Sequence, residues 1–136
     1  MTAERAKYGL LDTSVLVAAE SGRPLQIGAL PETAATSIVT LSELRAGIHL
    51  APDVESRDRR IATFELAASS PVLPVDASVA RIWAQMRAYL FASGEKVNVN
   101  DMWIAATAAS REIPVFTQDR DFNALSGVAG LTVIEV

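Results

Sequence analysis

The hydrophobic positions along the chain form short apolar runs separated by longer amphipathic stretches. Apolar runs of three or four residues occupy 8–11, 34–36, 72–75, 114–117 and 131–134, which is the length of short strands. The stretches between them have apolar residues at helical spacing and predict helices over 13–20, 38–50, 56–68, 77–91 and 101–111. The predicted order is therefore β-α-β-α-α-β-α-α-β-loop-β.

Short strands alternating with longer helices are typical of an α/β fold. Each crossover has to pack a helix onto the sheet, which favours a mostly parallel sheet of about four or five strands with helices on both faces. The chain has 136 residues, half of them hydrophobic, and no linker, repeat or low-complexity segment. We therefore expect residues 1–136 to form a single domain.

Composition narrows the chemistry to carboxylates. Twelve Lys and Arg against sixteen Asp and Glu leave a net charge of −4, so no basic surface indicates nucleic acid. There is no cysteine and only one histidine, His49, which argues against disulfides, thiolate zinc sites and a histidine-based triad. No apolar run approaches the roughly 20 residues that span a bilayer. Residues 1–7 lack the features of a secretory signal, so we expect a cytoplasmic protein that does not contact a membrane.

Two acidic loops follow predicted strands. Asp12 comes directly after the first strand, and Asp119 and Asp121 follow the strand that ends at Thr117. In parallel sheets, ligands bind outside the carboxyl ends of the strands. Each acid also has a structural interpretation, because an Asp at such a position caps the next helix or forms an Asx turn.

Two further acids lie on apolar faces of predicted helices. Glu43 lies in a row with Val39, Ala46 and Leu50, and the opposite side of its helix carries Leu41, Leu44 and Ile48, so we expect that helix to be buried on two sides. Asp101 begins the row Ile104, Ala105 and Ala108. Glu43 pairs either with an arginine such as Arg45 or with a metal, because a buried carboxylate needs a cation. Alternatively, Asp101 is simply an acid that the helix dipole stabilises in the first turn, although Asn98 and Asn100 can provide the cap.

Asp12, Glu43, Asp101 and Asp119 come from four segments that a parallel sheet can gather at one edge. Four carboxylates held close together repel one another unless a hard divalent cation lies among them, which predicts Mg²⁺ or Mn²⁺. Such a cation can generate a nucleophilic water and neutralise charge on a phosphoryl oxygen, so phosphodiester hydrolysis fits this site.

Four segments of the chain resemble PIN-domain ribonucleases: LLDTSVLVA (10–18), TSIVTLSELRAG (36–47), NDMWIAATA (100–108) and VFTQDRDF (115–122). Within that family the short chain and the spacing of these segments resemble VapC-type toxins of bacterial toxin–antitoxin pairs. The resemblance implies a PIN-like fold and assigns metal binding and catalysis to Asp12, Glu43, Asp101 and Asp119. It gives Thr13, Ser14 and Thr117 supporting roles and makes Asp121 an additional acid.

The resemblance also implies a Mg²⁺- or Mn²⁺-dependent endoribonuclease that acts as a toxin, forms a homodimer and is inhibited by a cognate antitoxin. The C-terminal segment of that antitoxin enters the active-site groove. Because the chain is acidic, RNA binding has to depend on local cations, for which Arg57, Arg59, Arg60 and Lys96 are candidates. Trp83 and Met86 fit core or dimer packing, and Trp103 fits an interface.

Two other classes of function are compatible with the carboxylates. The first is a different metal-dependent phosphohydrolase or a DNA nuclease. The second is a non-catalytic Mg²⁺-binding interaction domain similar to a receiver domain. A receiver-like domain needs an acceptor Asp after the middle strand and a Lys after a later strand, and the predicted strands are not followed by such a lysine. The chain also has no glycine-rich phosphate loop, which argues against nucleotide binding.

Overall fold

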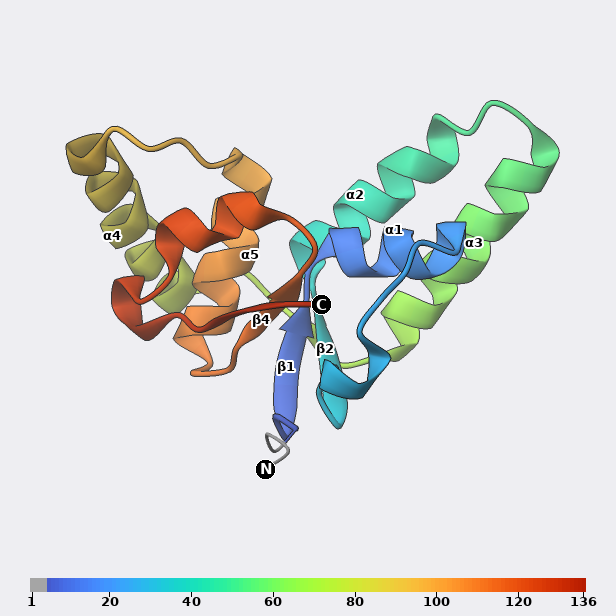
Figure 1. Ribbon diagram of the computed structural model, residues 1–136. Helices are drawn as coiled ribbons and strands as arrows, with labels where there is room; N and C mark the ends of the chain where they lie inside the picture. Colours follow the sequence, from blue (N-terminus) through green and yellow to red (C-terminus); the bar gives the residue numbers. More distant parts are fainter. Residues whose placement is uncertain (1–4) are drawn as a thin grey trace.

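The computed structural model describes residues 5–136 and consists of one sheet between two layers of helices (Figure 1). The strands are β1 (Tyr8–Leu11), β2 (Thr33–Ser37), β3 (Val72–Leu73), β4 (Val115–Thr117) and β5 (Val133–Glu135). The helices are α1 (Thr13–Ser21), α2 (Ile38–His49), α3 (Val54–Ser69), α4 (Ala77–Ser93) and α5 (Val99–Ser110). Three 3₁₀ helices complete it: η1 (Ile27–Ala29), η2 (Arg120–Leu125) and η3 (Val128–Gly130).

The sheet has the order β3-β2-β1-β4-β5, and every pair of neighbouring strands is parallel. Leu10 of the central strand is opposite Ala35 on one side and Val115 on the other. All five strands therefore end at the same edge, and the segments that follow them begin side by side. The predicted mostly parallel α/β fold and the order of its elements are confirmed.

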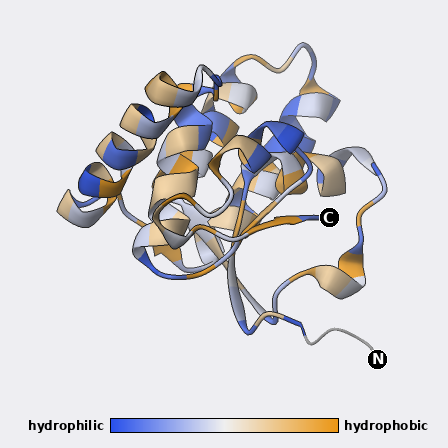
Figure 2. Cartoon of the chain, turned by 60° about the vertical axis from the view of Figure 1, so that its left-hand side comes forward, coloured by the Kyte–Doolittle hydropathy of each residue, from blue (hydrophilic) through white to orange (hydrophobic). Residues whose placement is uncertain are grey.

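Alternate residues of the strands face two different hydrophobic cores. Leu10 and Val115 are fully buried on the side of α4 and α5, where they meet Met86 and Ile104. Phe116 lies on the opposite side with Val15, and the α1–α2–α3 layer continues that side. Figure 2 shows hydrophilic and hydrophobic positions alternating along the helices, as expected for helices with one buried face.

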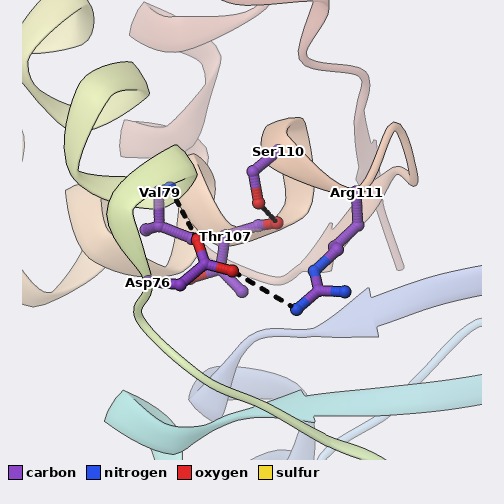
Figure 3. A network of polar contacts seen from close by, with 5 residues as sticks. All are labelled: Asp76, Val79, Thr107, Ser110 and Arg111. Carbon is purple, nitrogen blue, oxygen red and sulfur yellow. Dashed lines mark hydrogen bonds and ion pairs between the residues drawn. The ribbon is translucent and has the colours of Figure 1, made fainter.

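Side-chain caps explain where the helices begin. Ser37 accepts a hydrogen bond from the Val39 amide at 3.0 Å, and Asp76 accepts one from the Val79 amide at 3.0 Å. Asp76 also forms an ion pair with Arg111 at 3.7 Å, which connects the start of α4 to the end of α5 (Figure 3). Because the capping side chain and the amide that it binds are two or three residues apart, helix starts of this kind can be read from the sequence.

The structure differs from the sequence prediction in three places. The predicted strand 72–75 has only two paired residues, because Pro74 has no amide hydrogen to extend the ladder. The stretch predicted as a loop before the last strand contains η2 and η3. Trp103 stacks on Trp83 with ring centroids 4.8 Å apart, so it packs within the chain where the sequence suggested an interface.

The predicted single domain of residues 1–136 extends over residues 1–4, which lie outside the described residues. The predicted absence of a secretory signal in residues 1–7 likewise lies partly outside them. None of the helices described between residues 5 and 136 is long and apolar enough to cross a membrane.

Candidate active site

Asp12 occupies the position directly after β1 and is 2% exposed. Its Oδ2 accepts hydrogen bonds from the hydroxyls of Ser14 at 2.7 Å and Thr117 at 2.9 Å. It also caps α1 through the Ser14 amide at 3.4 Å, which confirms the structural interpretation of this acid as a helix cap. Burial raises the pKa of Asp12 above its ordinary value, and these hydrogen bonds offset part of that increase. The second oxygen, Oδ1, receives no side-chain hydrogen bond from residues 5–136.

Thr117 links Asp12 to Asp119. The Thr117 hydroxyl donates to Asp12 and accepts a hydrogen bond from the Asp119 amide at 2.9 Å. Asp119 Oδ1 in turn accepts from the Asp121 amide at 2.9 Å, which is the Asx turn that the sequence suggested. The hydroxyl at the end of β4 therefore fixes two acid-bearing segments relative to each other. Asp119 Oδ2 has no side-chain donor within residues 5–136.

Glu43 approaches the site from α2. Its Oε1 accepts a hydrogen bond from the Thr13 hydroxyl at 2.7 Å, and Thr13 also hydrogen-bonds the buried Thr40 hydroxyl at 3.0 Å. Glu43 is only partly buried, because the row that the sequence indicated as apolar is open to solvent at Leu50, which is 77% exposed. The expected burial of this row is wrong, and the buried residues of α2 are Thr40 together with Leu44 and Ile48 of the second apolar side.

No arginine pairs with Glu43 in the described part of the chain. The one ion pair within 4 Å in residues 5–136 joins Arg111 to Asp76. Arg45 instead lies over the ring of Phe64, at 5.5 Å from the centroid. The charge of Glu43 therefore stays available to the site.

Asp101 lies in the first turn of α5, above the buried residues Ile104, Ala105 and Ala108. Asn98 caps this helix through the Asn100 amide at 2.9 Å, so Asp101 is not needed for capping. Burial raises the pKa of Asp101 to about 7, and the charges of the acids around it add to the effect: Asp12, Asp119, Glu43 and Asp121. All four of those charges are negative, so Asp101 lies within electrostatic reach of four other acids.

No three of the Asp, Glu and His side chains in residues 5–136 come together tightly enough to hold a metal ion as they stand. The donor set nevertheless fits a hard divalent cation. Within residues 5–136, Asp12, Glu43 and Asp119 each have one oxygen tied by a hydrogen bond and one without a side-chain donor, and Asp101 accepts no side-chain hydrogen bond. None of the four forms an ion pair within 4 Å in this part of the chain, and such carboxylate oxygens are typical ligands of Mg²⁺ and Mn²⁺.

Two contributors to the site were not found in the sequence. Thr40 forms a hydrogen bond with Thr13, and the structure buries it completely. The signal in the sequence was a polar residue between apolar ones, one turn before Glu43 on the predicted helix. The Gln118 amide donates to Ser14 at 3.0 Å, and its side chain donates to the Pro24 carbonyl at 2.8 Å. Because Gln118 acts through its backbone and a distant loop, local spacing could not reveal it.

Comparison with known proteins identifies the class. Residues 9–128 match the family model of the PIN domain, and the chain therefore belongs to the PIN-domain family. It is similar to Ribonuclease VapC5 of Mycobacterium tuberculosis, with 51% identity over 94% of this chain and 95% of the relative. It is also similar to Ribonuclease VapC4 of the same organism, with 37% identity over 93% of this chain and 98% of the relative.

Among solved structures, the chain is similar to the crystal structure of VapBC-5 from Mycobacterium tuberculosis, a member of the VapBC family of toxin–antitoxin systems. The TM-score is 0.89 with 47% sequence identity, over 96% of this chain and 99% of that chain. The predicted resemblance to VapC-type PIN-domain proteins is thereby confirmed.

Proposed function

We propose that this protein is a Mg²⁺- or Mn²⁺-dependent endoribonuclease that acts as the toxin of a toxin–antitoxin pair. The observation that carries the proposal is the gathering of Asp12, Glu43, Asp101 and Asp119 at the carboxyl edge of the sheet, with free oxygens and a raised pKa at Asp101. The relatives named ribonucleases support RNA as the substrate.

In this proposal Asp12, Asp101 and Asp119 hold the cation, and Glu43 completes its surroundings or orients a water molecule. A bound divalent cation supplies positive charge beside the scissile phosphate and makes a water molecule more acidic. Ser14 and Thr117 fix the carboxylate of Asp12 in one orientation, and Thr13 does the same for Glu43. Asp121 adds negative charge at the rim.

The comparisons support an antitoxin as a partner of this protein. Because the similar structure of VapBC-5 belongs to a toxin–antitoxin system, we propose that a cognate antitoxin inhibits this protein by inserting its C-terminal segment into the active-site groove. We also propose a homodimer, as in the family that the sequence resembles. The proposal places the protein in the cytoplasm, with its RNA substrate.

The test is cleavage of a mixed pool of structured RNAs by protein purified free of antitoxin, in Mg²⁺, in Mn²⁺ and in chelator. We expect cleavage only with metal, and a loss of at least about a hundredfold in Asp101→Asn, because the amide cannot supply the charge that binds the cation. Single-stranded DNA of matched length, run in parallel, distinguishes a ribonuclease from a DNA nuclease.

Asp58→Asn is the matched control, because Asp58 is an exposed residue of α3 and its charge is not among those that raise the pKa of Asp101. It should cleave at the wild-type rate. Cleavage that persists in chelator, or an Asp101→Asn variant as fast as wild type, would falsify the site. Calorimetry with Mn²⁺ then shows whether the acids bind metal at all.

A further inference from the structure

A polar hollow of about 530 Å³ lies between the end of α4, the segment that joins it to α5, and η2. Tyr89, Lys96 and Arg120 line it, and their side chains are exposed. Asp121 lines it too, and its charge raises the pKa of Asp101. The hollow therefore begins where the carboxylates of the site end, since Asp119 caps η2 immediately before Arg120.

The two cations of this hollow are not used elsewhere in residues 5–136. Neither Lys96 nor Arg120 forms an ion pair within 4 Å or a side-chain hydrogen bond, although Glu95 and Asp121 line the same hollow. Two positive and two negative charges make the hollow close to neutral. It contrasts with the neighbouring site, where the charges that act on Asp101 are all negative.

The arginines on the other side of the site are less suited to bind a phosphate. A second hollow, of about 250 Å³, contains Thr13 and Glu43, and its one cation is Arg60. Arg60 donates to the Gly47 carbonyl at 2.6 Å, and Arg59 donates to the Ser56 hydroxyl at 3.2 Å. Both are engaged within the α2–α3 hairpin, so the sequence-based candidates Arg59 and Arg60 are weaker than Lys96.

We infer that Lys96 and Arg120 each bind a backbone phosphate of the RNA strand, and that a base next to these phosphates stacks on the ring of Tyr89. The inference rests on the proposed ribonuclease function and names residues that select and position its substrate. An acidic protein needs such local cations, because each phosphate contact replaces the counterions that the strand loses on binding. An exposed aromatic ring beside them accepts any base on its face.

The test measures binding of a labelled single-stranded RNA by fluorescence anisotropy, across a range of salt concentrations, in the Asp101→Asn background with Mg²⁺. Lys96→Gln and Arg120→Gln should each reduce the slope of log affinity against log salt by about 0.7. Tyr89→Ala should weaken binding by on the order of tenfold, whereas Tyr89→Phe, which keeps the ring, should bind like its parent.

Matched controls come from the opposite edge of the sheet. Lys7 precedes β1 and Arg81 lies in the first half of α4, and both are exposed. Lys7→Gln and Arg81→Gln should leave the salt slope unchanged. In cleavage assays with the catalytic acids intact, Lys96→Gln and Arg120→Gln should raise KM and leave kcat close to wild type, because they act on binding.

The inference and the proposed function fail in different ways. Wild-type slopes in both Lys96→Gln and Arg120→Gln overturn the inference even when the wild-type protein cleaves RNA. Normal RNA binding together with a loss of antitoxin binding also overturns it, because the hollow is then a protein-binding site. A wild-type protein that does not cleave RNA refutes the ribonuclease proposal, while the binding measurement still decides whether Lys96 and Arg120 hold a phosphate.

Discussion

Asp101 is the acid whose pKa burial and the neighbouring negative charges raise most clearly. Its pKa, raised to about 7, means that the folded protein holds a proton there that the unfolded chain releases near pH 4. The stability that this group contributes is fully present below about pH 4 and is lost as the pH rises through about 7. In the metal-free protein, ionised Asp101 therefore destabilises the fold at neutral pH.

We therefore predict that Asp101→Asn melts at a higher temperature than the wild type at pH 8 in chelator. The difference should shrink towards pH 5, where wild-type Asp101 is protonated. Saturating Mg²⁺ should reverse the order, since the cation stabilises only the protein that binds it. Thermal melts at pH 5 to 8, with and without metal, make the comparison. A variant less stable than wild type at every pH contradicts this explanation.

Thr117 should act by positioning, through the carboxylate of Asp12 and the amide of Asp119. Thr117→Val removes the donor and the acceptor with little change of shape, and we expect metal affinity or kcat to fall by about ten- to a hundredfold. Thr117→Ser, which keeps the hydroxyl, should restore most of the loss. Calorimetric titration with Mn²⁺ and single-turnover cleavage measure the two effects.

The matched control is Thr107→Val. Thr107 is equally buried but donates to the Trp103 carbonyl at 2.7 Å, inside α5 and without contact to the acids. It should change thermal stability and leave cleavage alone. Equal losses of activity in both variants indicate general destabilisation and contradict a positioning role for Thr117.

Among single residues, the structure brings the acids that the sequence singled out near Asp101, but their surroundings were predicted less well. Asp12 and Asp119 were identifiable because strand ends are a matter of local pattern. Glu43 was found for a partly wrong reason, since helical periodicity does not show which of two apolar rows faces the core. The pairing of Thr117 with Asp12 spans 105 residues and depends on β1 and β4 being neighbours, which no local pattern encodes.

Among the elements, β1 has a tight contact at Gly9. A Cβ at this position would overlap the ring of Phe116 and lie 3.0 Å from Pro31 Cγ. Phe116 is fully buried in β4, so its ring has little room to move. We predict that Gly9→Ala lowers the free energy of unfolding by about 1–3 kcal/mol. Denaturant titration measures it.

Gly47 provides the control within α2. A Cβ there meets nothing closer than Arg60 Cδ at 4.0 Å, so Gly47→Ala should stabilise the protein by about 0.4–1 kcal/mol. Destabilisation by Gly47→Ala, or none by Gly9→Ala, contradicts this account of the two glycines.

The elements themselves were largely predictable because their signals are local. Asp76, Ser37 and Asn98 cap their helices through hydrogen bonds to amides two or three residues further on, and Gly22 ends α1 with φ of 74°. The early end of β3 at Pro74 is also a local signal that the sequence carries. By contrast, η2 and η3 pack Phe122, Leu125 and Val128 against the core, so they emerged only with the structure.

For the whole molecule, the most exposed large apolar side chain is Phe91 at the end of α4, with 81% of its surface exposed among the described residues. It lines a hollow of about 630 Å³ with Trp83 and Val99, and Lys96 lines both this hollow and the polar one, so the interface has to leave Lys96 open to RNA. If the protein is a homodimer, as we propose, this face suits the interface, and Phe91→Asp should shift it to monomer. Light scattering after size-exclusion chromatography gives the mass.

Ile27→Asp is the control for that prediction, because Ile27 is 72% exposed on η1, at a different part of the surface. It should keep the mass of the wild type. A monomeric wild-type protein rejects the homodimer, and dissociation by Ile27→Asp alone moves the interface to the other side of the sheet.

The stacked pair of Trp83 and Trp103 has a spectroscopic consequence. The chain contains no other tryptophan, and both rings lie in the layer formed by α4 and α5. Intrinsic tryptophan fluorescence therefore reports on the layer of α4 and α5, and it does not report directly on the α2–α3 hairpin. A fluorescence melt that precedes or follows the loss of circular dichroism then reveals which side of the sheet opens first.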